Sequence, residues 1–87
     1  MKITKKAIAG TMQSSDLTVQ IEPSDRLEIR IESTVKKQFE HLIRARIEEV
    51  LARHGVKTGI LSISDRGALD YAIEARCEAA LRRASEG

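Results

Sequence analysis

The stretch LTVQIEPSDRLEIRIE, residues 17–32, decides the fold. Apolar residues occupy every second position in residues 17–22 and again in residues 27–32, which is the period of a β-strand with one buried face. The four residues between these segments, Pro-Ser-Asp-Arg, are typical of a turn. We therefore predict an antiparallel hairpin whose odd-numbered apolar side chains share one face.

The register of this hairpin is restricted by its apolar face. Both apolar sets lie on one side only if odd positions pair with odd positions. Ile21 opposite Ile29 meets this condition but also places Glu22 opposite Glu28, and like charges directly opposite each other are unfavourable. The register shifted by two, with Glu22 opposite Arg26, therefore stays open.

Apolar residues recur at helical spacing after the hairpin and indicate a first helix. Ser33 or Thr34 is a candidate N-cap, because a short hydroxyl side chain can accept a bond from the first free N–H groups. Gly55 is a candidate for the left-handed residue that ends the helix. The apolar stripe consists of Val35, Phe39, Leu42, Ile43, Ile47, Val50 and Leu51.

Two further strands and a second helix complete the pattern. Residues 7–12 are a weak first strand, since Gly10 and two alanines have low β-propensity. Residues 59–64 alternate again, and this strand can pair in parallel with a neighbour through a right-handed crossover. After a turn at residues 65–67, the second helix carries an apolar stripe of Leu69, Ile73, Cys77, Ala80, Leu81 and Ala84.

This order predicts an α+β fold. We expect a small, mostly antiparallel sheet, in the order β-β-β-α-β-α along the chain, with two helices packed on one face. Phe39, Leu42 and Leu69 are expected to pack on the apolar face of the hairpin, so that Leu42→Ala costs roughly 2–5 kcal/mol through the cavity it leaves. The opposite face is expected to meet water. A chain of 87 residues is expected to form a single domain over residues 1–87.

Composition argues against several classes of function. The net charge of +2 is a small difference between 15 basic and 13 acidic residues, and Phe39 and Tyr71 are the only aromatic residues, so we expect no nucleic-acid partner. No apolar run approaches the ~20 residues that span a bilayer, so we expect no membrane association. The basic start lacks the apolar segment of a secretory signal, and the single cysteine fits a reducing compartment. We therefore expect a cytoplasmic protein.

The side chains that usually carry catalysis are sparse. His41 and His54 fall on different faces of one predicted helix, so no metal site is expected. Cys77 lies on an apolar stripe and is expected to be a core residue. Arg46 and Arg76 lie at stripe edges, where the stem packs and the guanidinium stays in water. The pattern predicts no catalytic residues.

The segment GTMQSSD, residues 10–16, connects the first two predicted strands. Two serines followed by Asp16 favour a turn, because their side chains can bond nearby backbone N–H groups. The segment therefore places exposed serine hydroxyls in a surface loop. Gly10 permits a positive φ or a close backbone approach, and Thr11 is expected to brace the loop together with Asp16.

Residues 7–16, AIAGTMQSSD, resemble the opening of the citrate lyase acyl carrier protein, the gamma subunit of that complex. The likeness continues in residues 35–39 (VKKQF), 65–70 (DRGALD) and 74–76 (EAR). The family usually has Glu where this chain has Gln13.

This resemblance implies a carrier and not a catalyst. In the family, the serine that matches Ser14 carries 2'-(5''-phosphoribosyl)-3'-dephospho-coenzyme A through a phosphodiester. The thiol of this arm holds acetyl and then citryl as thioesters, while citrate is cleaved to oxaloacetate and acetate. The implied partners are the alpha (acyl transferase) and beta (citryl lyase) subunits and a prosthetic-group transferase. Because such an arm visits several active sites, we expect the loop at residues 11–16 to be mobile.

Three alternatives stay open. Physical reasoning alone does not separate the hydroxyl of Ser15 from that of Ser14 as the attachment point. The related acyl carrier of malonate decarboxylase would use the same prosthetic group with other subunits. A small RNA-binding α+β module, with contacts from Lys2, Lys5 and Lys6, is a candidate from a different class.

Overall fold

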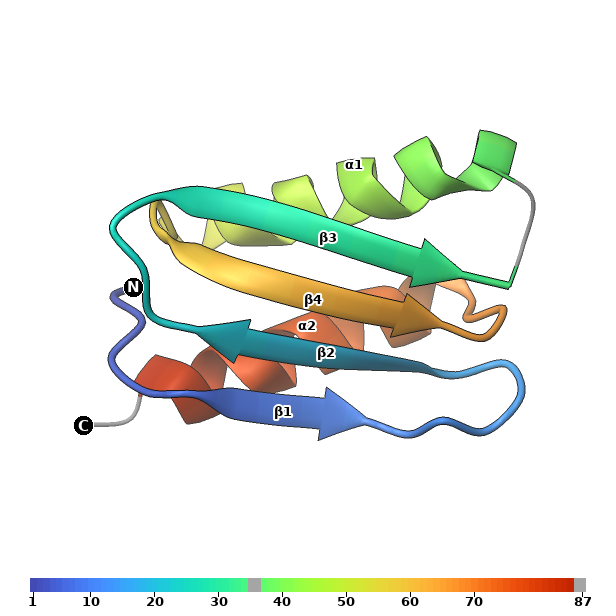
Figure 1. Ribbon diagram of the computed structural model, residues 1–87, viewed down its shortest axis with the longest axis horizontal. Coiled ribbons are helices and arrows are strands. Elements are labelled where there is room, and N and C mark those ends of the chain that lie inside the picture. The colour runs from blue at the N-terminus through green and yellow to red at the C-terminus, as the bar shows by residue number, and fades with distance from the viewer. Residues whose placement is uncertain (35–36, 86–87) are drawn as a thin grey trace.

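The computed structural model describes residues 1–34 and 37–85. Four strands and two helices follow one another in the predicted order. The elements are β1 (Ala7–Gly10), β2 (Leu17–Glu22), β3 (Leu27–Ser33), α1 (Lys37–Arg53), β4 (Gly59–Asp65) and α2 (Asp70–Ser85). The α+β class is confirmed, with a four-stranded, mostly antiparallel sheet and both helices on one face (Figure 1).

The predicted pairing of β2 with β3 is wrong. The strand order is β1-β2-β4-β3, so β4 lies between the two strands of the expected hairpin. β4 pairs antiparallel with β2 and parallel with β3. The connection at residues 23–26 therefore spans the width of a strand, and Gly59 N donates a 2.8 Å hydrogen bond to Arg26 O as β4 begins. The parallel pairing of β4 through a helical crossover is confirmed.

The physical reason for this order is burial. The inward side chains of β4, Leu61 and Ile63, are almost completely buried, whereas Ile29 and Ile31 of β3 are only partly buried. A strand with a fully apolar inner face and small outward residues is more stable in the centre of the sheet than at an edge. Alternation alone could not distinguish the strands, because the inward residues of all three have odd numbers.

The predicted inner face is nevertheless correct. Val19 and Ile31 flank Ile63 on its two sides in the sheet, and Ile21 and Ile29 flank Leu61 in the same way. This face packs against the helices, with α1 over β3 and α2 over β1 and β2. The fully buried core of the helices includes Ile47, Val50, Cys77, Ala80, Leu81 and Ala84.

Three residues expected on this face are instead exposed: Phe39 is 44%, Leu42 55% and Leu69 59% accessible. Leu42 lies about 100° around the helix from Ile43, which is buried, and it therefore projects from a different side of α1 that stays in contact with solvent. Phe39 lies one turn before Ile43, near the start of α1, and Leu69 precedes α2. The core prediction for these three residues is therefore wrong.

The start of α1 leads out of β3 through residues 35 and 36, so the cap predicted at Ser33 or Thr34 depends on residues outside the described part of the chain. Ser33 ends β3, and its Oγ donates a 2.9 Å hydrogen bond to Asp65 Oδ2. Thr34 N donates to Asp65 O. Val35, predicted as part of the apolar stripe, lies outside the described residues.

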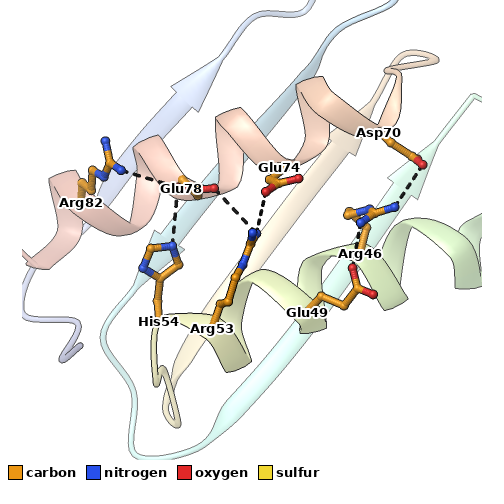
Figure 2. A network of polar contacts seen from close by, with 8 residues as sticks. All are labelled: Arg46, Glu49, Arg53, His54, Asp70, Glu74, Glu78 and Arg82. Atoms are coloured by element: carbon orange, nitrogen blue, oxygen red, sulfur yellow. Dashed lines mark hydrogen bonds and ion pairs between the residues drawn. The ribbon is translucent and has the colours of Figure 1, made fainter.

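A row of ion pairs joins the solvent sides of the helices (Figure 2). Arg53 Nη2 lies 2.7 Å from Glu74 Oε1, and Arg46 Nη2 lies 3.2 Å from Asp70 Oδ2. Exposed pairs of this kind contribute little individually, about 0–1 kcal/mol. They link α1 to α2 on the side of the helices away from the sheet. Among the described residues, no helix is long and apolar enough to cross a membrane.

Candidate functional site

The loop between β1 and β2 lies at the end of the sheet where β4 passes into α2 (Figure 1). Ser14 and Ser15 are both exposed there, as the sequence predicted. Asp16 N donates a 3.2 Å hydrogen bond to Gln13 O and closes a four-residue turn with the two serines in its centre. Ser15 has a φ of 63°, which is uncommon for a residue other than glycine.

Asp16 is the centre of the hydrogen bonds that shape this loop. Its carboxylate accepts bonds from Thr11 Oγ1 at 2.5 Å and from Leu17 N at 2.8 Å. Arg76 of α2 donates two more, from Nε at 3.2 Å and from Nη2 at 2.9 Å. The hydrogen bonds from Arg76, and then those from Thr11 and Leu17, hold the pKa of Asp16 well below its ordinary value. The predicted bracing by Thr11 and Asp16 is confirmed.

The expectation for Arg76 is wrong, because its guanidinium bonds Asp16 and is not left to water alone. A pair separated by 60 residues leaves no local pattern in a sequence. The available signal was that Asp16 and Arg76 both belong to segments that resemble the same family.

A second anchor joins the loop to the turn after β4. Ser15 N donates a 2.8 Å hydrogen bond to Arg66 O, and Arg66 N donates a 2.9 Å bond to Asp16 O. That turn is fixed by Asp65, which is buried and accepts bonds from Gly67 N at 3.1 Å and Ala68 N at 3.0 Å. The loop is therefore held from two directions by the body of the fold.

Gly10 sets the start of the loop. It has a φ of 102°, and a Cβ built at this position would lie 1.9 Å from Leu17 O. Thr11 N donates to the same Leu17 oxygen at 3.2 Å, so the two ends of the loop approach each other closely. The positive φ expected for this glycine is confirmed, and the backbone that approaches it closely is that of Leu17 in the same chain.

The loop is more constrained than we expected. The N–H groups of Thr11, Gln13, Ser15 and Asp16 all have hydrogen-bond acceptors. Within the described part of the chain, the N–H groups of Met12 and Ser14 and the hydroxyl of Ser14 have no hydrogen-bond partner. Freedom of motion is therefore expected mainly for Ser14, since Met12 Sδ accepts a 3.1 Å hydrogen bond from the Thr18 hydroxyl, and mobility of the whole loop is not supported.

The arrangement fits covalent attachment to Ser14. Within the described residues no base contacts its hydroxyl, and a serine without an adjacent base is a poor nucleophile by itself. A negative phosphodiester on an exposed turn keeps its hydration and costs little. The carboxylate of Asp16 is already paired with Arg76, which reduces its repulsion of a second negative charge. Ser14 thus presents a solvent-exposed hydroxyl at the tip of the turn.

Other candidate side chains lie away from this site. Burial, followed by the charge of Glu78, raises the pKa of Cys77 to about 12, so its thiol stays protonated in the core. His54 Nε2 contacts Glu78 at 3.5 Å, and His41 is exposed. The described residues contain no group of three side chains that could hold a metal ion.

The exposed apolar residues lie next to the candidate site. Phe39 and Leu42 line a hollow of about 250 Å³ together with Gly67 and Ala68. Gly67 follows Arg66, whose backbone binds the serine loop. An apolar surface therefore adjoins the loop that presents Ser14.

Comparisons with known proteins show which family the chain resembles. The sequence model of the family described as malonate decarboxylase delta subunit matches residues 4–84. A citrate lyase acyl carrier protein of Haemophilus influenzae (strain PittGG) is 48% identical over 86 residues, which covers 99% of this chain and 90% of that protein. The corresponding protein of Treponema denticola is 46% identical and covers 99% of both chains.

A similar fold occurs in the crystal structure of a Pseudomonas malonate decarboxylase hetero-tetramer in complex with malonate. The TM-score is 0.72 over 95% of this chain and 87% of that chain. At 21% identity this likeness concerns the fold alone.

Proposed function

The chain belongs to the family of acyl carrier proteins of citrate lyase and malonate decarboxylase, and we propose that it is the acyl carrier subunit of a citrate lyase. In this role it carries acetyl and citryl thioesters while citrate is cleaved to oxaloacetate and acetate. The observation that carries the proposal is the exposed Ser14 at the tip of a braced turn, which has no hydrogen-bond partner among the described residues. Residues 1–87 act as a single acyl-carrier domain in this proposal.

Ser14 is the attachment residue in this proposal, and two observations support it over Ser15. The backbone N–H of Ser15 is bonded to Arg66 O, and its φ lies in the left-handed region. Ser14 has neither restraint, so a modifying enzyme can take up its side chain and backbone without breaking an existing bond. Gln13 precedes it and donates its N–H to Thr11 Oγ1, a bond that does not depend on the Gln13 side chain.

The group proposed for this position is 2'-(5''-phosphoribosyl)-3'-dephospho-coenzyme A, which supplies the thiol that forms the thioester. The chain itself provides the attachment oxygen, a fixed direction for the arm and a solvated setting for the phosphodiester. Asp16 and Arg76 hold the base of the turn, so the arm leaves the body of the protein at a defined point.

The chain acts as a non-catalytic subunit, and the proposed partners are the alpha subunit (acyl transferase), the beta subunit (citryl lyase) and the prosthetic-group transferase. Tethering supports this arrangement, because a linked group reaches successive active sites at an effective concentration in the mM range. The exposed Phe39 and Leu42, which line one hollow with Gly67 and Ala68, support contact with other subunits, since adjoining apolar side chains on a surface mark protein contacts. We place this assembly in the cytoplasm.

A carrier for malonate decarboxylase is the second candidate, favoured by the fold of the Pseudomonas hetero-tetramer. Reconstitution distinguishes the two candidates. The modified protein is added to carrier-free citrate lyase subunits and, separately, to carrier-free malonate decarboxylase subunits. We expect citrate cleavage in the first mixture and no malonate decarboxylation in the second; the reverse result would replace the proposed function with the second candidate.

A further inference from the structure

The face of the sheet opposite the helices is uncovered (Figure 1). It contains a hollow of about 330 Å³, here called the sheet-face trough. Its walls include Met12, Thr18, Gln20, Arg30, Ser62 and Ser64. Four of these six side chains are small or medium-sized, polar and uncharged.

The strand register explains why a trough forms there. Thr18 lies beside Ser64, and Gln20 lies beside Ser62, on the two central strands β2 and β4. On the next strand, β3, Arg30 lies beside Ser62 with a longer side chain. Short side chains in the centre and a longer one along β3 leave a depression where a sheet face would otherwise be flat.

The trough opens beside the proposed attachment residue. Met12, two residues before Ser14, is one of its lining residues. The Thr18 hydroxyl lies 3.1 Å from Thr11 O and 3.1 Å from Met12 Sδ, so the serine loop is bonded to the trough wall. A group attached to Ser14 therefore begins two residues from Met12, which lines the trough.

The chemistry of the walls suits the nucleotide part of such a group. Hydroxyl and amide side chains both donate and accept hydrogen bonds, as ribose hydroxyls require. Arg30, which pairs with Glu28, offers a guanidinium to phosphate oxygens. Glu32 also lines the trough, beside Ser64, and its charge disfavours a phosphate at that position. Among the described residues that line the trough, Arg30 is therefore the cation that can bond phosphates, through N–H donors that its pair with Glu28 does not use.

We propose that the nucleotide part of the arm on Ser14 rests in the sheet-face trough between transfers, with its sugar hydroxyls on the serine, threonine and glutamine side chains and its phosphates at Arg30. This inference rests on the proposed function. Neutral contacts in an open depression bind a free ligand weakly, but a tethered ligand is present at an effective concentration in the mM range. The arm can thus rest in the trough between transfers, while its weak affinity for the trough lets it leave for a partner's active site.

The test uses the full chain, coexpressed with the modifying enzymes and analysed first by intact mass. Amide chemical shifts of modified and unmodified protein are then compared. We expect shifts at Gln20, Ser62 and Ser64, and none at Ala79 on α2. In Ser62→Glu, where a carboxylate repels the phosphates, we expect the added mass to remain and these shifts to disappear. Ala75→Glu places the same charge on an exposed position of α2 and should keep the shifts.

The outcomes separate the inference from the function on which it rests. Added mass with shifts confined to residues 11–16 overturns the resting place and leaves the carrier function intact. Shifts at Gln20 and Ser64 that persist in Ser62→Glu also overturn it. Absence of added mass in the wild-type protein overturns attachment and the resting place together.

Discussion

The guanidinium of Arg76 on α2 holds the carboxylate of Asp16 in the β1–β2 loop by two hydrogen bonds, of 3.2 Å from Nε and 2.9 Å from Nη2. A paired, two-point contact of this kind fixes direction as well as distance. The loop that presents Ser14 is therefore oriented by the helix layer on the far side of β1 and β2. Carrier function in this account depends on a defined exit point for the arm and not on a loose loop.

Arg76→Ala should release the base of the loop. We expect faster amide hydrogen exchange at Asp16 and Leu17 and slower modification of Ser14, because the turn no longer holds one orientation. Arg76→Lys should recover part of the effect, since an ammonium cannot make the same two-point contact. Arg82→Ala removes another arginine of α2 and should leave loop exchange unchanged. Equal exchange in wild type and Arg76→Ala would contradict the role assigned to this pair.

The stability of the protein should depend on pH through Asp16. Its pKa is lowered in the folded state from the ordinary value of 3.8, so the unfolded state binds the proton more readily. The stabilisation is therefore complete above about pH 4 and is lost as pH falls below it toward the folded pKa. In urea unfolding, the difference between wild type and Asp16→Asn should shrink from pH 7 to pH 3. Asp25→Asn, on the exposed β2–β3 connection, is the matched control, and a pH-independent difference for Asp16→Asn would count against this prediction.

Gly10→Ala should destabilise the fold by about 1–3 kcal/mol or more, measured by urea unfolding. The added Cβ would lie 1.9 Å from Leu17 O, at a residue whose φ is 102°. Gly67→Ala isolates the effect of φ, because Gly67 has a φ of 89° but no atom within 4 Å of its Cβ position. The Gly67 variant should therefore be the less destabilised of the two. Equal losses would mean that the close approach at Gly10 carries no additional cost.

Truncation of α1 side chains tests the position of the core. Ile47→Ala should cost roughly 2–5 kcal/mol, because Ile47 is fully buried and leaves a cavity. Leu42→Ala should cost well under that, since Leu42 is 55% exposed. Urea midpoints of the two variants provide the comparison. A larger loss for Leu42→Ala would restore the packing that the sequence alone suggested.

The comparison of β2 with β4 shows what the sequence could predict. Alternation correctly assigned Val19, Ile21, Leu61 and Ile63 to the inner face, because a period of two is a local property. The sequence could not predict which strands are neighbours. The inward residues of β2, β3 and β4 all have odd numbers, so alternation permits several strand orders, and the observed order depends on burial across the whole sheet. The apolar stripe predicted for α1 was too wide for the same reason. The sequence alone does not show which side of the helix the sheet buries, and Leu42 lies outside that side.

The candidate site also combines features that the sequence could predict with features that required the fold. The turn and the exposed hydroxyl of Ser14 followed from residues 10–16 alone. The pairing of Asp16 with Arg76 joins residues 60 positions apart and needed the fold. The constraint on Ser15 required its φ and its bond to Arg66, neither of which a sequence contains.

The most direct test of the central claim is the mass of the protein after coexpression with the prosthetic-group enzymes, followed by mass analysis of the peptide that contains residues 10–16. The account predicts added mass on the wild-type protein and on Ser15→Gly, since glycine accepts the positive φ of that position. It predicts no added mass on Ser14→Ala, which should fold normally because the exposed Ser14 side chain makes no contact that the fold requires. Added mass on Ser14→Ala together with its loss from Ser15→Gly would contradict the assignment.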